Sequence, residues 1–239
     1  MWFEKRTFNP EHLCFHEALQ FFASYFGSVT LCRFPIEEDG IIIKTPGCDQ
    51  VVKLHGAAEM IGFLTGNSPQ PISLAYSLAP TPIHLPGDPP ERTGELPANR
   101  IGPTLCVYLL GYAFERHHAS IKKKQPKKPD GKDDLQSWDK DLQFFRHIRN
   151  GCFHGNRFQI WKGQVARNPP PHTGWPRSNV PEWRNHIIMI DDSSGTDQIV
   201  DEHGAELNGR KVIGEYLYVP DVLPLLYDMG NRIAEVLKP

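Results

Sequence analysis

The sequence lacks the cysteine pattern of a disulfide-stabilised or zinc-binding domain. Its five cysteines are odd in number and include no C-x-x-C pair, which argues against a disulfide framework and against a zinc knuckle. Long hydrophobic runs are absent as well: no apolar stretch approaches the length of a membrane span, and residues 1–6 have no signal-peptide core. We therefore expect a soluble, cytoplasmic protein with reduced thiols and no membrane partner.

The chain also lacks an excess of charge of one sign. Lysine and arginine together number 26 against 28 for aspartate and glutamate, and the pI is near 6.6. Such a protein is not expected to coat nucleic acid non-specifically, so any contact with nucleic acid should be local. The sequence contains no glycine-rich phosphate loop, G-x-S-x-G elbow or paired metal-binding carboxylates. It therefore predicts neither a cofactor nor a metal ion.

Helical periodicity is what the sequence does contain. It predicts helices over residues 9–27, 51–64, 103–123, 135–152 and 221–237. Strand and turn patterns occupy residues 29–35, 40–45 and 158–217, and the proline-rich stretch 65–100 is expected to be loop. The predicted fold is mainly α, a four- or five-helix bundle with appended β-hairpins, α+β by content. We expect a single domain over residues 1–239, with 158–217 as a β-rich insertion before the last helix.

The fourth predicted helix carries the main candidate site. Its apolar stripe runs from Leu135 through Phe145 and continues into Arg149, so a charged residue takes a position where a core side chain is expected. Arg149 begins an R-x4-H motif that ends at His154. One fixed cation and one group that moves protons are a minimal set for cleaving a phosphodiester.

The spacing of this pair requires a change in the helix. Residues five apart on a continuous α-helix point about 140° away from each other. The pairs Asn150-Gly151 and Gly155-Asn156 have poor helix propensity, and Gly155 suits a left-handed C-cap. We therefore expect the helix to change or end at the motif.

A simpler alternative gives both residues structural roles. Arg149 would pair with a carboxylate, Asp141 or Asp228 for example, while His154 would cap carbonyls at the helix end.

The spacing alone carries little weight, because it occurs twice. Arg167 and His172 form a second R-x4-H, but three consecutive prolines separate them. Polyproline geometry holds such a pair apart on an exposed loop. His12 and His16, one helical turn apart, resemble metal ligands only in spacing, because Leu13 stands where the H-E-x-x-H motif has glutamate.

The segment from Phe145 to Asn156 resembles the signature of HEPN domains, which are helical bundles with an R-x4-6-H motif. The residue after the arginine in that motif is often Asn, Asp or His. Arg149, Asn150 and His154 match the three positions. The order of the predicted helices, with one after the motif, is similar to the family's layout, whereas residues 158–217 are not part of a minimal HEPN bundle.

The resemblance implies a metal-independent endoribonuclease that acts as a homodimer in bacterial toxin–antitoxin or antiviral defence systems. His154 would deprotonate the 2′-OH of RNA, Arg149 would neutralise the phosphate, and Asn150 would orient His154 or the phosphate. The products would be a 2′,3′-cyclic phosphate and a 5′-OH. Some members carry a tyrosine two residues after the histidine, which a partner antitoxin modifies, but this chain has Asn156 there. That form of regulation is therefore not expected.

Further cations lie close to the motif. A helix C-terminus repels anions, so a phosphate bound there needs side-chain cations, and Arg146 and His147 are candidates. The linker before the motif helix offers more: we predict RNA-binding roles for Lys122, Lys123, Lys124, Lys127 and Lys128. The alternative is an ordinary solvated linker, because Asp130, Asp133 and Asp134 follow.

Two other functions fit the same residues. A catalytically inactive HEPN-like module would use them to bind RNA, nucleotide or a partner protein. A metal-dependent nuclease is a weaker alternative. It would require that a chelator stops the activity.

Overall fold

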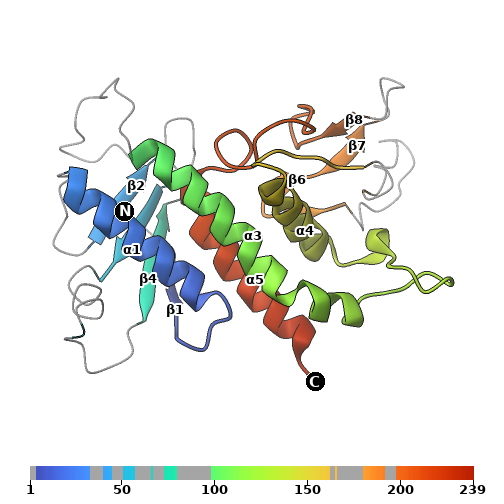
Figure 1. The fold of residues 1–239 in the computed structure, drawn as a ribbon, viewed down its shortest axis with the longest axis horizontal. Helices are drawn as coiled ribbons and strands as arrows, with labels where there is room; N and C mark the ends of the chain where they lie inside the picture. The colour runs from blue at the N-terminus through green and yellow to red at the C-terminus, as the bar shows by residue number, and fades with distance from the viewer. Residues whose placement is uncertain are drawn as a thin grey trace. The chain divides into compact units, whose positions relative to one another are not determined.

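The structure is a computed structural model that describes residues 4–32, 40–44, 51–56, 66, 73–79, 98–161, 165, 180–191 and 198–239. The chain forms two compact units (Figure 1). The first contains Met1–Leu109 and Leu217–Asn231, and the second contains Leu110–Tyr216 and Arg232–Pro239. The prediction of one HEPN-like domain over residues 1–239 stays a prediction.

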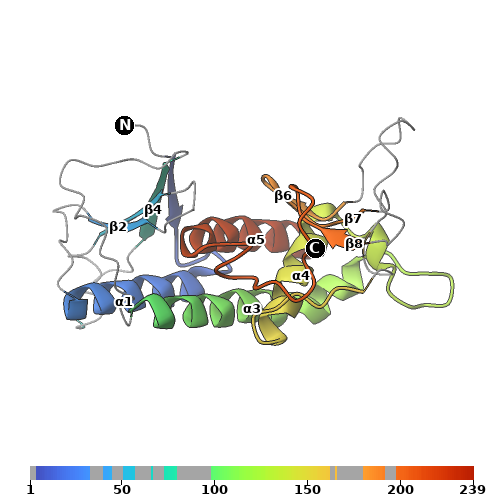
Figure 2. The ribbon, with the colours of Figure 1, turned by 90° about the horizontal axis from the view of Figure 1, so that it is seen from above.

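An antiparallel four-stranded sheet forms the base of the first unit. Its strands are β1 (Glu4–Phe8), β2 (Gly40–Lys44), β3 (Val51–His55) and β4 (Leu74–Ala79), in the order β1-β4-β3-β2. Most described side chains of the two central strands, β4 and β3, are buried. Helix α1 (Phe15–Cys32) lies along one face of this sheet (Figures 1 and 2).

Aromatic contacts join the sheet to the C-terminal helix. A 3-10 turn, η3 (Val219–Asp221), leads into α5 (Val222–Leu237). The ring of Tyr227 lies 5.3 Å from that of Phe8 and 6.4 Å from that of Tyr76, centroid to centroid. Arg6 Nη1 donates a hydrogen bond of 2.8 Å to Asp228 Oδ1 on the same helix. The first and last parts of the chain thus share one core.

The second unit contains two helices and two short antiparallel strand pairs. The helices are α3 (Ala98–Lys124), whose first residues belong to the first unit, and α4 (Lys140–Phe153), preceded by the 3-10 turn η1 (Leu135–Ser137). Strands β5 (Glu182–Trp183) and β6 (His186–Ile187) form one sheet, and β7 (Met189–Asp191) and β8 (Gln198–Val200) another.

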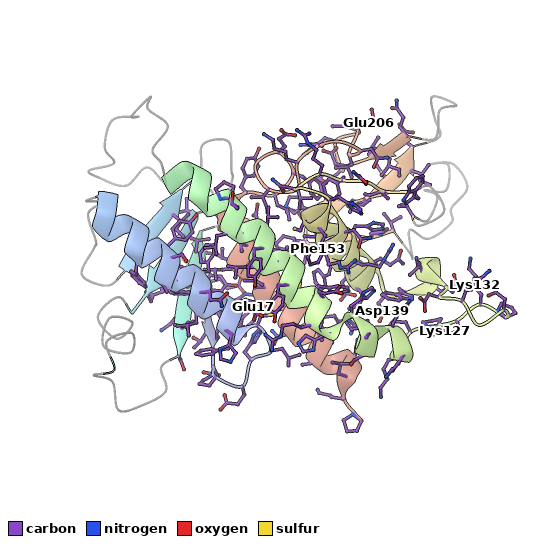
Figure 3. The ribbon with its side chains drawn as sticks, viewed as in Figure 1. Glu17, Lys127, Lys132, Asp139, Phe153 and Glu206 are labelled. Atoms are coloured by element: carbon purple, nitrogen blue, oxygen red, sulfur yellow. The ribbon has the colours of Figure 1, made fainter. Side chains whose placement is uncertain are left out.

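Helices α3 and α4 approach each other closely at a glycine. A Cβ added to Gly111 would lie 3.2 Å from Cβ of Cys152 and 3.5 Å from a ring carbon of Phe153. A side chain at position 111 would require Cys152 to shift by a few tenths of an ångström, so the glycine favours this close approach of the two helices. Figure 3 shows Phe153 at the end of α4, beside α3.

The chain that leaves α4 is bound to a later loop. Both amide atoms of Asn156 hydrogen-bond to the backbone of Ile213: Nδ2 donates to the carbonyl at 3.0 Å, and Oδ1 accepts from the N–H at 2.8 Å. Phe158 exchanges backbone hydrogen bonds with Arg210 and Gly209, at 3.0 and 2.9 Å. Residues 156–160 and 208–213 therefore form one layer against the end of α4.

The predicted helical bundle is wrong. The described residues contain four α-helices and eight strands in three sheets, which is an α+β fold. Residues 51–55, expected to be helical, are strand β3, and residues 74–79, expected to be loop, are strand β4. Residues 29–32, expected to be strand, continue α1. Short apolar runs do not distinguish helix from strand, and pairing with neighbouring strands decided these cases.

Other expectations about the elements are confirmed. Helices α3, α4 and α5 contain most of the predicted segments 103–123, 135–152 and 221–237, and strands β5 to β8 lie within residues 158–217. Residues 57–65, 80–97 and 166–179, on which further expectations fall, lie outside the described residues. In the part of the chain that is described, no helix is both long and apolar enough to cross a membrane.

Replacing Gly151 by alanine tests the packing at the end of α4. The added Cβ would lie 2.4 Å from Cγ2 of Val212, a fully buried and branched side chain. We expect Gly151→Ala to lower the free energy of unfolding by about 1–3 kcal/mol, measured by chemical denaturation.

Gly27→Ala is the matched control, because a Cβ there meets open space on α1. Replacing this helical glycine should leave stability unchanged or raise it by about 0.5–1 kcal/mol. Equal effects of the two substitutions would contradict the close packing at Gly151.

Candidate functional site

Helix α4 ends within the R-x4-H motif. Its last residue is Phe153, and His154 is the C-cap. Gly155 and Asn156 then adopt left-handed conformations, with φ of 70° and 63°. Backbone N–H groups of Asn156 and Arg157 close the helix end on the carbonyls of Cys152 and Gly151, at 3.4 and 3.0 Å. The predicted helix end and the left-handed Gly155 are confirmed.

Arg149 is held in place by α3 and by its own neighbour. Its Nε donates to Oε2 of Glu115 at 2.8 Å, and its Nη2 lies 2.5 Å from the same oxygen. Its Nη1 donates to Oδ1 of Asn150 at 2.7 Å. The guanidinium carbon also lies 4.9 Å from the ring centroid of Phe153. The arginine is therefore fixed, with 23% of its side chain exposed.

Pairing of Arg149 with a carboxylate was one of the expected alternatives, but both suggested partners were wrong. The partner is Glu115, whereas Asp141 pairs with Arg232 and Asp228 with Arg6. Glu115 sits on another helix, and the sequence does not show that this turn of α3 lies against α4. Glu115 is thus a site residue that the sequence did not indicate.

His154 is exposed at the helix end. Its backbone N–H donates to the carbonyl of Asn150 at 3.0 Å, and its side chain makes no hydrogen bond or ion pair with any described residue. It therefore does not cap carbonyls with its ring. No hydrogen bond joins His154 to Arg149 in the described structure, and α4 is regular up to Phe153, so the two side chains diverge as residues five apart on a helix do.

Arg146 and His147 lie in the interior. Arg146 is 4% exposed and His147 is 1% exposed, and Nη2 of the arginine is 3.2 Å from Nε2 of the histidine. Burial, together with the nearby charge of Arg149, lowers the pKa of Arg146 to about 10, so it stays cationic at pH 7. The structure does not place these two side chains on the surface beside His154.

The predicted lysine-rich linker is divided in the structure: Lys122, Lys123 and Lys124 form the last turn of α3, and the chain after them folds back as a small hairpin. Lys127 and Asp133 form a β-bridge, and Gly131 takes a positive φ at the tip. Figure 3 shows Lys127 and Lys132 on this projecting segment. Asp133 pairs with both Lys122 and Lys127, and Lys124 Nζ donates to the carbonyl of Lys238 at 3.3 Å. The side chains of the two remaining lysines, Lys123 and Lys128, are exposed and form no ion pair with a described residue, although Lys128 interacts electrostatically with Asp130.

A second histidine lies on the other side of Glu115. His118 Nδ1 is 3.6 Å from Oε2 of Glu115, the oxygen that also receives Arg149. Its ring contacts Phe114 and Trp138, with centroid distances of 5.7 and 6.3 Å. Burial and the positive charge of Arg149 lower the pKa of His118 below its ordinary value, and Glu115 partly opposes this shift. In the sequence, His118 stands out only as part of the run Arg116-His117-His118.

A shallow groove follows the motif. It is lined by residues 157–161 together with Asn208 and Gly209. Exposed and buried side chains alternate along 157–161, so Arg157, Gln159 and Trp161 share one face, and Trp161 is 73% exposed. An exposed tryptophan on an extended segment is a surface on which a planar ring can stack.

We compared the chain with known proteins. Searches against protein-family models, curated proteins and solved structures found no match. The HEPN resemblance therefore depends on the motif and its surroundings alone.

The other candidates are a metal site and the second R-x4-H pair. Within the described ranges, no group of three or more His, Cys, Asp or Glu side chains could hold a metal ion. His12 precedes α1, and its Nε2 lies 3.2 Å from the carbonyl of Tyr227, so it belongs to the core of the first unit. Arg167 and His172 lie outside the described residues.

The titration of His118 tests the contacts around Glu115. Arg149→Met removes a positive charge and should raise the pKa of His118, whereas Glu115→Gln removes a negative charge and should lower it. Histidine ring signals followed by NMR against pH measure both shifts. Shifts in the same direction, or no shift in either variant, would show that the three residues are not arranged in this way.

Proposed function

We propose that this protein is a metal-independent endoribonuclease that cleaves RNA by attack of the 2′-OH on the adjacent phosphate. The observation that supports the proposal most is that one helix end carries both a fixed arginine and an exposed histidine. Arg149 is held by Glu115 and Asn150, and His154 is open to solvent. RNA supplies its own nucleophile, so binding of the phosphate and proton transfer are the chemistry that remains.

Arg149 keeps the capacity to bind a phosphate. A guanidinium has five N–H donors. Glu115 occupies those of Nε and Nη2, and Asn150 accepts one from Nη1. One N–H on each of Nη1 and Nη2 is left over, and these two groups can donate charge-assisted hydrogen bonds to a phosphate. Asn150 then orients the arginine rather than His154.

A homodimer fits the divergence of the two motif residues. Residues five apart on a helix point about 140° away from each other, and no hydrogen bond joins Arg149 to His154 among the described residues. A second copy can bring its own helix end to the same phosphate, so that the arginine and the histidine of a composite cleft come from different chains. The exposed ring of Phe153, between the two residues, gives such a contact an apolar centre.

The biological setting we propose is the cytoplasm of a cell with a toxin–antitoxin or antiviral defence system, with a neutralising partner protein. Modification at the position two residues after the histidine is not part of the proposal. Asn156 stands there, and both of its amide atoms bind the backbone of Ile213.

A second candidate function is a catalytically inactive module that binds RNA, nucleotide or a partner protein. The ion pair between Arg149 and Glu115 favours it, because it already partly neutralises the arginine. Such a module would hold an anion at the same place without proton transfer.

Cleavage of labelled RNA in EDTA tests the proposed function. Arg149→Ala and His154→Ala should each lower the rate by about 10²-fold or more, as expected for loss of a phosphate ligand or a proton-transfer group. The product should carry a 2′,3′-cyclic phosphate. The controls are Arg167→Ala and His172→Ala in the second R-x4-H, and His203→Ala at a histidine whose side chain is 82% exposed.

Each outcome of this assay has a separate meaning. Binding without a cyclic-phosphate product supports the inactive module. Activity that EDTA stops supports a metal-dependent nuclease, and full activity in the Arg149 and His154 variants removes the motif from the mechanism.

The lysines at the end of α3 and on the following hairpin allow a matched test of RNA binding. Lys123→Ala with Lys128→Ala removes two exposed cations, and should lower the affinity and reduce the salt dependence by about one unit of slope for each lost contact. Lys122→Ala with Lys127→Ala removes the same charge, but these lysines pair with Asp133, so their loss should weaken binding less. Equal losses of RNA affinity in the two double variants, measured by filter binding, would contradict this distinction between exposed and paired lysines.

A further inference from the structure

Cleavage by the 2′-OH needs two proton transfers. A base takes the proton of the 2′-OH, and an acid gives a proton to the 5′-oxygen as the bond from phosphorus to that oxygen breaks. A guanidinium does not give up its proton in proteins, and an asparagine amide has no ionisable group. The proposed site therefore contains one proton-transfer group, His154, where the reaction uses two.

We propose that His118 is the second proton-transfer group of this site and acts as the base. The inference rests on the proposed function, because it assigns a role within that reaction. It adds a residue from α3, outside the R-x4-H motif.

The carboxylate of Glu115 links His118 to the phosphate-binding arginine. Oε2 of Glu115 accepts from Arg149 at 2.8 Å and lies 3.6 Å from Nδ1 of His118. At 3.6 Å the contact is electrostatic rather than a hydrogen bond, and such contacts often shorten when substrate binds. A carboxylate beside Nδ1 favours the tautomer that carries its proton there. Nε2 then presents a lone pair, as a base requires.

The surroundings of His118 keep it neutral. The charged groups around it are Glu115 and Lys122 on α3, and Arg146 and Arg149 on α4. The three cations and burial favour the uncharged ring, and only Glu115 opposes them. With a pKa below its ordinary value, His118 is mostly unprotonated at pH 7. His154, which is exposed to solvent, is the group left to act as the acid.

The reaction balances with these two histidines. Nε2 of His118 takes the proton of the 2′-OH as the 2′-oxygen bonds to phosphorus. The bond from phosphorus to the 5′-oxygen breaks, and that oxygen takes a proton from protonated His154. The products are a 2′,3′-cyclic phosphate and a 5′-OH, and exchange with water restores both histidines.

The pH dependence of cleavage tests the inference. His118→Phe keeps an aromatic ring against Phe114 and Trp138 and removes the proton-transfer group. We expect kcat to fall about 10²- to 10⁴-fold, with little change in the Kd for RNA and with loss of the acidic limb of the pH–rate profile. Glu115→Gln should move that limb to lower pH, because it removes the charge that raises the pKa of His118. His117→Phe, at the neighbouring histidine of α3, is the control and should keep the wild-type profile.

The results separate the inference from the proposed function. If the wild-type protein cleaves RNA in EDTA and His118→Phe keeps its rate and acidic limb, His118 is not the base and the proposed function stands. If the wild-type protein does not cleave RNA, the proposed function is wrong, and the assignment of His118, which rests on it, is wrong as well. Equal losses of rate in His118→Phe and His117→Phe would indicate a structural effect on α3 and overturn the assignment.

Discussion

The close approach of α3 and α4 at Gly111 is the constraint on which the candidate site depends. With no side chain at Gly111, the backbone of α3 can lie against Cys152 and Phe153 of α4. Glu115 lies one helical turn beyond Gly111, and Arg149 one turn before Cys152 and Phe153, so the approach of the helices brings the carboxylate to the guanidinium. A larger residue at position 111 would press on Cys152 and Phe153 and so strain the crossing that positions Glu115 beside Arg149.

The charges of the second unit compensate one another at this crossing. Arg146 and Arg149 lie three residues apart on α4, and like charges at that spacing oppose each other. The shift in the pKa of Arg146 reflects this repulsion as well as burial. Glu115 offsets part of the cost and is shared between Arg149 and His118, so one carboxylate stabilises two groups that a phosphate also attracts.

The sequence predicted those parts of the site that depend on local chemistry. The end of α4 and the left-handed Gly155 follow from residues that are neighbours in the chain. Glu115 and His118 could not be predicted, because their contact with Arg149 depends on how two helices cross. Strands β3 and β4 were misassigned for a related reason: a short apolar run becomes a strand only when partners lie beside it. Five lysines looked alike in the sequence, but pairing with Asp133 sets two of them apart.

The amide of Asn156 makes the end of α4 and the loop at residues 208–213 a cooperative unit. Two side-chain hydrogen bonds and one backbone hydrogen bond, from Val212 to the carbonyl of Asn156, join the turn to this loop. Local opening of the loop would therefore also release the turn that carries His154. A ligand that bound the neighbouring groove at Asn208 and Gly209 and required the closed loop would therefore also stabilise the turn that carries His154.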